Sequence, residues 1–476
     1  MAMKGLTLQA IAAACGGKLY NGKDSQDKEI SCAVMDSRKI ESGGLFLASP
    51  GEKVDGHKFI GQVYEAGALC VVTMKTPDEV EKEHGIPQSI WGAYILVEDT
   101  FTALKQIAAF YRSKLTIPVV GITGSVGKTS TKEFIAGVLS AKYKVLKTEG
   151  NYNNEIGLPL TILRIRQEHE AAVLEMGISE FGEMSRLGEM AKPDICVITN
   201  IGQCHLENLH DRAGVFKAKT EIFDHMQPDG EICLNGEDDL LSMVSVVNGK
   251  PVHHFGLSER EDLEVFATDI ENKGLQGSSV KMHIRNEEGT RTVCPIEVAL
   301  PGLHMINNAM AAALVGKLLG LSMEEIKEGI TKVEPVCGRS NILKLSDKVV
   351  IDDCYNANPV SMKAALDLLS TAEGRKVAVL GDMFELGERS DAMHAEVGSY
   401  AADLKIEGIY CVGESAKLMY EAAEKKNHTG LDIRHYEKRE ALLEKLPTLL
   451  LPGDTVLIKA SHGMGFAEVV EVLKSL

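Results

Sequence analysis

The sequence predicts an α/β protein built from three domains. Its 476 residues exceed what one hydrophobic core normally supports, so the chain should divide. Short apolar runs alternate with longer helical patterns over residues 118–200 and again over 348–461, which is typical of βαβ units and parallel sheets. A glycine-rich loop follows the first of these strands, as in phosphate-binding sheets. We expect domains at residues 1–99, 100–335 and 336–476.

Residues 1–99 predict a small α/β domain, with apolar runs such as GALCVVTM and AYILVEDT separated by turns. The apolar residues of 6–12 can line one face of an amphipathic helix. Gln9 interrupts the apolar stretch that the alternative, a signal peptide ending at a lipid-modified Cys15, would need. We therefore expect a folded first helix, and no stable membrane insertion, because no later apolar run could span a bilayer.

Residues 100–335 predict a mostly parallel sheet. A helical stretch at 100–115 leads to Pro118, and strands are predicted in PVVGIT, YKVLKT, AAVLEM and DICVITN. Farther along, DLEVFATDI, SVKMHIRN and TVCPIEVAL are typical of antiparallel strands added to that sheet. A helix beginning near His304 should close the domain.

Residues 336–476 predict a Rossmann-like domain. The preceding segment KVEPVCGRSN contains Pro335 and Gly338, which favour a linker. Beyond it, the runs KVVIDDCY, KVAVLGD, GIYCVG and TVLIKAS alternate with helical patterns, as in a dinucleotide-binding fold.

Composition excludes some classes of function. A formal net charge of -17 argues against a nucleic-acid partner, because such binding draws its affinity from clustered Lys and Arg. The ten cysteines form no Cys-x-x-Cys pair, which favours reduced thiols over a disulfide frame or a zinc site. We expect a cytoplasmic protein and, although no motif fixes the oligomeric state, a monomer.

The segment GITGSVGKTS has the context of a phosphate loop, between an apolar strand and a helix. Its glycines let the backbone approach phosphate oxygens, Lys128 can reach the β and γ phosphates, and Thr129 can ligate magnesium. The spacing departs from G-x-x-x-x-G-K-[ST], because Ile122 stands five residues before Gly127, and a chance glycine turn is the alternative. The expected nucleotide contacts in this loop are Gly124, Ser125, Val126, Gly127, Lys128, Thr129 and Ser130.

Together with NYNNEIGLPLT, the loop TGSVGKTS resembles the superfamily of Mur ligases and folylpolyglutamate synthetases. The segments LEMGISEFGEM, ITNIGQCHLENL, KAKTEIF, GRSN, IDDCYNANPVSM and LGDMFELGE follow in the family's order. DSRKIESGGLF and VDGHKF resemble the family's UDP-sugar-binding N-terminal domain, so the resemblance covers nearly the whole chain. We identify the chain as a member of the Mur ligase family.

Within that family, GDMFELG and DDCYNANP resemble the members that add D-alanyl-D-alanine. The Asp-Asn-Pro-Arg of diaminopimelate-adding members is absent, and folylpolyglutamate synthetases usually carry Gly-Lys-Gly-Ser in the loop. The resemblance implies ATP-dependent ligation of D-alanyl-D-alanine to UDP-N-acetylmuramoyl-tripeptide through an acyl phosphate, with ATP and Mg²⁺ as cofactors. It leaves open whether the third residue of the tripeptide is lysine or diaminopimelate. Alternatives are another Mur ligase or a folylpolyglutamate synthetase that adds a single amino acid, and a non-catalytic nucleotide-binding regulator.

The resemblance implies a magnesium centre beside the phosphate loop. Glu175 ends the run AAVLE and His205 follows the next run, where strands of a parallel sheet deliver side chains to the ligand crevice. Lys219 in KAKTEIF matches the family's carbamylated lysine, whose CO₂ adduct serves a second Mg²⁺. Expected metal ligands are Thr129, Glu175, His205 and Lys219; expected catalytic residues are Lys128, His205 and Lys219. A surface or capping role is the alternative for Glu175 and His205, but their shared position beside the phosphate loop favours the metal site; without the resemblance, a solvated helix charge would be preferred for Lys219.

The resemblance also assigns nucleotide contacts beyond the loop. Asn308 in GLHMINNAMAA matches an adenine-contacting asparagine, although Met305 stands where the family often has a second one. Arg339 matches a phosphate-binding arginine and Asp353 a ribose-binding acid, both brought in by domain closure. The NYNN run at 151–154 is expected near the phosphates. Exposure of a linker arginine and simple turn formation are the alternatives.

Substrate-binding residues are expected in both outer domains. The uridine diphosphate pocket is assigned to Ser37, Arg38, Asp55, Gly56 and His57, where turn formation is the alternative for Asp55-Gly56. Lys459 and Ser461, in IKASHGMGF, are expected near the incoming dipeptide, with helix capping as the alternative for Ser461.

Overall fold

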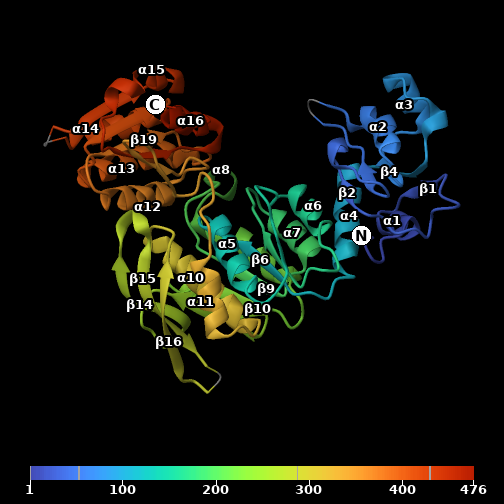
Figure 1. Ribbon diagram of the computed structural model, residues 1–476, viewed down its shortest axis with the longest axis horizontal. Helices are drawn as coiled ribbons and strands as arrows, with labels where there is room; N and C mark the ends of the chain where they lie inside the picture. Colours follow the sequence, from blue (N-terminus) through green and yellow to red (C-terminus); the bar gives the residue numbers. More distant parts are fainter. Residues whose placement is uncertain (1, 52–53, 287, 428–429, 476) are drawn as a thin grey trace.

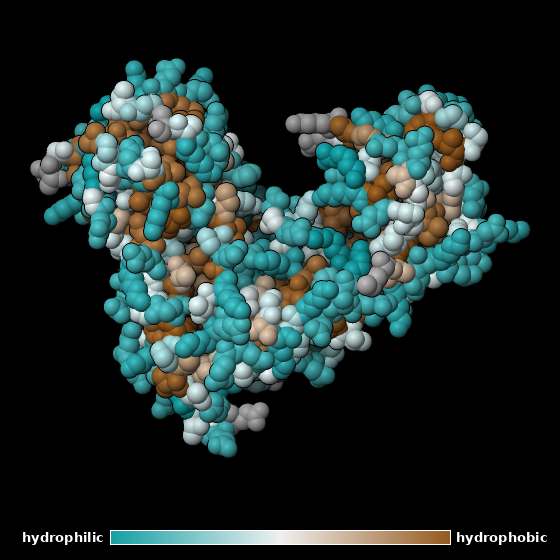
Figure 2. Space-filling model, in the orientation of Figure 1, coloured by the Kyte–Doolittle hydropathy of each residue, from teal (hydrophilic) through white to brown (hydrophobic). Residues whose placement is uncertain are grey.

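The computed structural model describes residues 2–51, 54–286, 288–427 and 430–475 and confirms a three-domain α/β fold (Figure 1). Each domain is built on one main sheet, and the N-terminal and C-terminal domains form lobes on either side of the central one. Figure 2 shows the same face of the molecule, hollowed between those two lobes. The exact domain bounds given above stay a prediction.

The N-terminal sheet has the order β1-β5-β4-β3-β2 and is parallel except for β1. Its strands are β1 (Lys18–Tyr20), β2 (Ala33–Val34), β3 (Leu45–Leu47), β4 (Cys70–Thr73) and β5 (Ala93–Leu96), and its helices are α1 (Leu8–Ala14), α2 (Ile60–Glu65) and α3 (Pro77–His84). Helix α1 begins after Thr7, whose hydroxyl accepts a hydrogen bond from Ala10 N, and it buries Leu8 and Ile11. The expected amphipathic first helix is therefore confirmed.

The central sheet has nine strands in the order β16-β15-β14-β13-β10-β9-β6-β8-β7. They are β6 (Val119–Thr123), β7 (Val145–Lys147), β8 (Ala171–Glu175), β9 (Ile195–Ile198), β10 (Glu231–Asn235), β13 (His253–Gly256), β14 (Leu263–Asn272), β15 (Ser278–Arg285) and β16 (Arg291–Val298); β11 (Val246–Val247) and β12 (Lys250–Pro251) form a separate ribbon. Its helices are α4 (Thr100–Arg112), α5 (Lys128–Leu139), α6 (Gly157–Ile162), α7 (Glu183–Ala191), α8 (Leu206–Leu209), α9 (Arg212–Thr220), α10 (Leu303–Leu318) and α11 (Met323–Thr331).

Buried side chains on the two faces of the central sheet belong to two separate cores. Along β6, Val119 packs with apolar residues of α4, α6 and α7, whereas Val120 packs with those of α5, α10 and α11. Because neighbouring residues of a strand point to opposite faces, a continuous apolar run such as VVGIT indicates a strand covered on both sides. The carboxyl ends of β6, β8 and β9 therefore meet at one edge of a buried sheet.

The C-terminal sheet has the order β17-β18-β22-β19-β20-β21 and is parallel except for β17. Its strands are β17 (Asn341–Lys344), β18 (Val349–Asp352), β19 (Lys376–Gly381), β20 (Gly408–Val412), β21 (Asp432–Tyr436) and β22 (Thr455–Lys459), and its helices are α12 (Pro359–Ser370), α13 (Ser390–Asp403), α14 (Ala416–Lys425), α15 (Arg439–Leu449) and α16 (Ala467–Ser475). None of the helices in the described residues is both long and apolar enough to cross a membrane.

The structure confirms every strand named from the sequence and adds several that were missed. It also corrects one detail, because β14, expected in the antiparallel set, pairs in parallel with β13 and only its other edge is antiparallel, to β15. Strands β1, β2, β10, β11, β12, β13, β17 and β21 were not predicted.

Candidate active site

The glycine-rich loop joins β6 to α5 with a backbone that requires glycine. Gly124 has φ of +150°, and a Cβ at that position would lie 1.9 Å from Thr199 Oγ1. Gly127, the residue before α5, has φ of +86°. Both conformations are ones that residues with a side chain rarely adopt, so these two glycines are fixed by the shape of the loop.

Side chains at the end of β9 hold this loop in place. Thr199 Oγ1 and Asn200 Nδ2 donate to Val126 O at 2.6 and 2.8 Å, and Val126 N donates to Asn200 Oδ1 at 2.9 Å. Ser125 Oγ accepts from Gly202 N at 2.8 Å. The loop is therefore fixed by its neighbour strand before any phosphate binds, which is the preorganisation that anion binding favours.

Lys128 and Thr129, two polar residues of the loop, both lie near the carboxylate of Glu175. Lys128 Nζ donates to Gly124 O at 2.8 Å, and its pKa is lowered by burial, an effect that the nearby Glu175 partly opposes. Thr129 Oγ1 donates to Glu175 Oε1 at 3.2 Å. The loop lysine, hydroxyl and carboxylate thus lie together, as the sequence predicts.

Glu175, the last residue of β8, is buried, and only one of its two carboxylate oxygens accepts hydrogen bonds. Its Oε1 also accepts from Asn153 Nδ2 at 2.9 Å, whereas Oε2 has no hydrogen-bond partner among the described residues. The nearest cation to Oε2 is Lys132 Nζ, at 3.8 Å. A buried carboxylate oxygen without a partner is costly, and binding of a cation would compensate that cost.

Lys219 lies in the last turn of α9 and is completely buried. Its Nζ has no hydrogen-bond partner among the described residues. Burial, together with a smaller effect of the nearby Lys128, lowers the pKa of this amine to about 8. An unpaired buried lysine beside the phosphate loop is therefore poised to lose its charge.

Together these groups fit a magnesium ion. Hard oxygen ligands are what Mg²⁺ prefers, and it usually completes its shell with water and substrate phosphates. The Thr129 hydroxyl and the unpartnered oxygen of Glu175 supply such atoms beside a loop shaped for phosphate. The unpaired Lys219 amine would supply another only after conversion to an acid.

His205 lies one residue before α8 and has a positive φ of 52°. Its Nδ1 is 2.5 Å from Oε2 of Glu385, a residue of the C-terminal domain. This pairing lowers the pKa of the Glu385 carboxyl. A residue of the C-terminal domain therefore holds the imidazole of His205, which belongs to the central domain.

Arg339 crosses the same boundary. Its guanidinium stacks on the ring of Tyr355, with Cζ 3.9 Å from the ring centroid, and Nη2 donates to Thr129 Oγ1 at 3.4 Å. The arginine expected from the linker therefore touches the phosphate loop rather than solvent, and Tyr355 positions it.

Asp353 and Lys459 form a buried ion pair in this structure, with Lys459 Nζ 2.6 Å from Asp353 Oδ2. Asp353 Oδ1 accepts from Ser340 N at 2.9 Å, and Lys459 also donates to Asn356 O at 3.0 Å. Both side chains are satisfied within the protein, so their expected contacts with ribose and dipeptide stay predictions.

The two remaining nucleotide and dipeptide candidates have clear partners. Ser461 makes no side-chain capping bond, so the capping alternative is wrong; its Oγ accepts from Phe384 N at 2.9 Å. Asn308 lies behind the loop, where its Oδ1 accepts from Thr131 Oγ1 at 3.0 Å and would lie 3.3 Å from a Cβ placed on Gly127. Its expected contact with adenine stays a prediction.

One cavity of about 590 Å³ collects most of these residues between the central and C-terminal domains. Its lining includes Ser125, Val126, Gly127, Lys128, Thr129, Ser130, Glu175, His205, Arg339, Asp353, Lys459 and Ser461. Gly124, Asn308 and the fully buried Lys219 are not part of the lining. A site assembled from two domains in this way is expected where ligands bind at domain interfaces.

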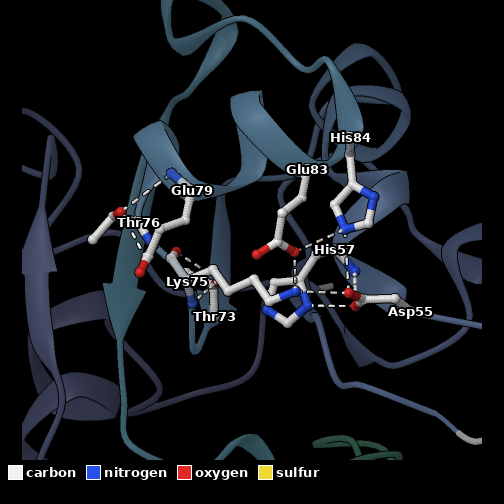
Figure 3. Close-up of polar contacts among 8 residues, drawn as sticks. All are labelled: Asp55, His57, Thr73, Lys75, Thr76, Glu79, Glu83 and His84. Carbon is white, nitrogen blue, oxygen red and sulfur yellow. Dashed lines mark hydrogen bonds and ion pairs between the residues drawn. The ribbon is translucent and has the colours of Figure 1, made fainter.

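The residues expected to bind uridine diphosphate lie in the N-terminal domain and outside that cavity. Asp55 lies among three basic groups (Figure 3): His57 Nδ1 at 2.6 Å, Lys75 Nζ at 2.9 Å and His84 Nε2 at 3.2 Å. Lys75 also pairs with Glu83 at 2.5 Å. The Lys75 ammonium therefore pairs with both carboxylates.

The same network leaves one buried atom free. His57 is fully buried, and its Nε2 has no hydrogen-bond partner among the described residues. Gly56 is required by close packing, because a Cβ there would come within 2.9 Å of Ser49 O. Ser37 is buried, whereas the side chain of Arg38 is exposed and pairs with Asp36 at 2.8 Å. The assignment of these residues to a uridine diphosphate pocket stays a prediction.

Fold and site together match those of an ATP-dependent amide-forming ligase, and the chain belongs to the Mur ligase family. Residues 29–112 match the family model "Mur ligase family, catalytic domain", residues 122–316 "Mur ligase middle domain", and residues 338–462 "Mur ligase, glutamate ligase domain".

Individual members of the family are similar over almost the whole chain. The UDP-N-acetylmuramoyl-tripeptide–D-alanyl-D-alanine ligase of Bacillus subtilis is 37% identical over 476 residues, covering 98% of each chain. A crystal structure of MurF from Acinetobacter baumannii is 31% identical, with a TM-score of 0.86 and 99% of each chain covered. MurF from Thermotoga maritima in complex with ADP is 27% identical, with a TM-score of 0.77, covering 93% of this chain and 97% of that one.

Several cavity residues were not singled out from the sequence. Asn200 is hydrogen-bonded to the phosphate loop. The ring of Tyr355 stacks on the guanidinium of Arg339, and Glu385 pairs with His205. His304 also lines the cavity, and burial lowers its pKa. Tyr355 and Glu385 stand in the quoted segments IDDCYNANPVSM and LGDMFELGE, but their spacing gives no sign of what they contact.

Proposed function

We propose that this chain joins D-alanyl-D-alanine to UDP-N-acetylmuramoyl-tripeptide while ATP is cleaved to ADP and phosphate, in the synthesis of the peptidoglycan precursor. The observation that carries the proposal is a single cavity in which the glycine loop, Lys128, Arg339 and a half-satisfied Glu175 meet. The choice of dipeptide is supported by the relative from Bacillus subtilis, which bears that activity in its name.

The chemistry explains why this cavity contains so many cations. A carboxylate becomes an amide only with a better leaving group than oxide, so its oxygen attacks the γ-phosphorus of ATP and ADP leaves. The dipeptide amine then attacks the carbonyl carbon of the acyl phosphate, phosphate leaves and the amine loses its proton. Before the first step two anions must approach, and Lys128 and Arg339 offset their repulsion.

Magnesium would be held by Thr129, Glu175 and His205, and when bound it neutralises phosphate charge and aligns the reacting groups. The backbone amides of the loop bind the phosphates, and the contacts from Thr199 and Asn200 keep those amides in place.

We include carbamylation of Lys219 in the proposal. Addition of CO₂ to the neutral amine forms an N–C bond and releases a proton, which leaves a carboxylate-like anion. The support is geometric: Nζ is buried, has no hydrogen-bond partner among the described residues, and lies beside the loop. As a carbamate, this side chain would gain oxygen atoms that a second magnesium could bind.

Domain contact explains how the acyl phosphate escapes hydrolysis. Arg339 and Glu385 reach from the C-terminal domain to Thr129 and His205 of the central domain, which narrows access of water to the cavity. We assign the sugar nucleotide to Ser37, Arg38, Asp55, Gly56 and His57, and the incoming dipeptide to the C-terminal domain at Lys459 and Ser461.

We further propose a monomer in the cytoplasm. The support for the compartment is that all ten cysteines are free thiols, eight of them buried, which fits a reducing environment.

A substrate panel tests the proposed reaction. The purified chain is given ATP and magnesium with tripeptide nucleotides that carry lysine or diaminopimelate, and with D-alanyl-D-alanine, single amino acids, or glutamate and a folate. We expect ADP and phosphate release only when a tripeptide nucleotide and D-alanyl-D-alanine are both present. Turnover with glutamate and a folate, or with a single amino acid, would overturn the proposal.

A further inference from the structure

A second contact, separate from that of Arg339, joins the two domains beside the cavity. Residues 385–387 follow β19 in the C-terminal domain. They contact residues 205–207, at the start of α8 in the central domain. Figure 1 shows the two domains. A Cβ on Gly387 would lie only 3.5 Å from the backbone of Glu207. Leu206 and Leu386 are both buried. Apolar packing therefore holds the two segments together, and the pair of His205 and Glu385 lies at the edge of this contact.

Backbone conformation on both sides of the pair is unusual. His205 has φ of 52° and Glu385 has φ of 62°, in the left-handed region that residues with a side chain rarely occupy. Each such residue is strained and persists only where its surroundings fix it. Two residues with positive φ that face each other across a domain boundary indicate that their contact has a functional role.

The contact also decides which ring nitrogen of His205 carries hydrogen. An ionised carboxylate only accepts hydrogen bonds, so at 2.5 Å from Glu385 Oε2 the Nδ1 atom must be the donor. In the neutral ring Nε2 then keeps its lone pair. An imidazole that binds a metal normally donates its other N–H to a carboxylate in this way.

We propose that Glu385 is the positioning residue of His205, supplied by the C-terminal domain to the magnesium side of the cavity. The inference rests on the proposed function, because it needs His205 to face magnesium. His205 then has the correct tautomer and orientation only while the two domains are docked. Formation of the site is thereby coupled to domain closure, in addition to the delivery of Arg339.

Removal of Glu385 should change this positioning without unfolding the protein. The Glu385 side chain is 56% exposed, so its ion pair contributes little to stability. Glu388, three residues later and exposed, makes no polar side-chain contact in the described structure and serves as the matched control.

The first experiment needs neither metal nor substrate. In the full chain labelled with ¹⁵N-histidine, loss of a signal in His205→Ala identifies the His205 ring, and its long-range ¹H–¹⁵N pattern reports the tautomer. We expect hydrogen on Nδ1 in the unmodified chain and in Glu388→Ala, and a mixture of tautomers in Glu385→Ala. An unchanged pattern in Glu385→Ala overturns the proposal.

The second experiment separates positioning from mere structure. Loss of a group that orients a metal ligand typically costs about 10- to 100-fold in metal affinity or activity. We expect Glu385→Ala to lower kcat and raise the magnesium requirement to that extent with little change in KM for the peptide substrates, and Glu385→Gln to restore part of both. A normal kcat and magnesium requirement in Glu385→Ala contradicts the proposal. If the unmodified chain ligates none of the panel substrates, the proposed function fails, whereas the tautomer measurement still decides the role of Glu385.

Discussion

Lys219 is the residue whose local structure departs farthest from what its sequence pattern suggests. KAKTEIF resembles a solvated helix face, and Lys217 is indeed exposed, but Lys219 is completely buried with an unpaired amine. Helical spacing places Lys219 on the buried face with Val215 and Lys217 on the opposite face, but the charge of both lysines favoured a solvated interpretation. The resemblance to a family supplied the distinction.

Substitution of Lys219 by alanine should abolish ligation while leaving the fold intact, because it removes an unpaired buried amine. If a carbamate is the missing group, short carboxylic acids should restore part of the activity. ADP release in the presence of both substrates, with and without added acetate, measures this.

Lys217→Ala is the control, since that side chain is exposed on the same helix and contacts the ring of Phe181. It should keep near-normal activity. Near-normal activity of Lys219→Ala would refute the carbamate and leave the ligase assignment standing.

Among single residues, sequence reasoning succeeded where a motif fixes the backbone. The glycines at 124 and 127, Lys128 and Thr129 follow from one loop pattern. Glu385 and Tyr355 could not be found, because their partners lie 180 residues away or in the linker and depend on how the domains dock.

At the scale of elements, the buried apolar strand β8 was predictable, whereas the polar edge strand β21 was not. AAVLE is buried at every position of β8, whereas β21 has the sequence DIRHY and lies at a sheet edge. An edge strand is half solvated, so it lacks the apolar run that indicates a strand. Strand β10, EICLN, was missed although four of its five residues are buried.

A charged cluster ties three neighbouring elements of the central sheet together. His253 of β13 lies between Glu264 of β14, at 2.5 Å, and Glu231 of β10, at 3.0 Å, and Lys317 of α10 also pairs with Glu264. The hydrogen bond to Glu264 raises the pKa of His253, and the same cluster lowers the pKa of Glu264 to about 2.

The ion pairs of His253 should therefore stabilise the fold at acidic pH, and this contribution to the free energy of unfolding should decrease as pH rises. With a raised pKa in the folded state, the contribution is fully present below the usual histidine pKa of 6.5 and is lost as pH increases through the folded value. Because the side chain is partly exposed, we expect roughly 1 kcal/mol.

Thermal unfolding of the unmodified chain and of His253→Gln at pH 6 and pH 9 measures this effect. The difference in Tm between the two proteins should be larger at pH 6 than at pH 9. A difference that grows with pH would contradict the assignment of charge to His253.

For the molecule as a whole, the order of domains followed from sequence but their contacts did not. Alternating strands and helices, together with the linker at Pro335, predicted the α/β class and the division of the chain. The cavity exists because residues 339 and 385 of one domain reach residues 129 and 205 of another. Such contacts depend on surfaces far apart in the chain, on which local patterns carry no information.

The central claim is that this interdomain cavity activates a carboxylate by transfer of phosphate from ATP. The most direct test uses a tripeptide nucleotide whose terminal carboxylate is labelled with ¹⁸O, turned over with ATP, magnesium and D-alanyl-D-alanine. If an acyl phosphate forms, one labelled oxygen must leave with phosphate, and mass spectrometry will find ¹⁸O in the phosphate that is released. Amide formation with unlabelled phosphate would contradict the account.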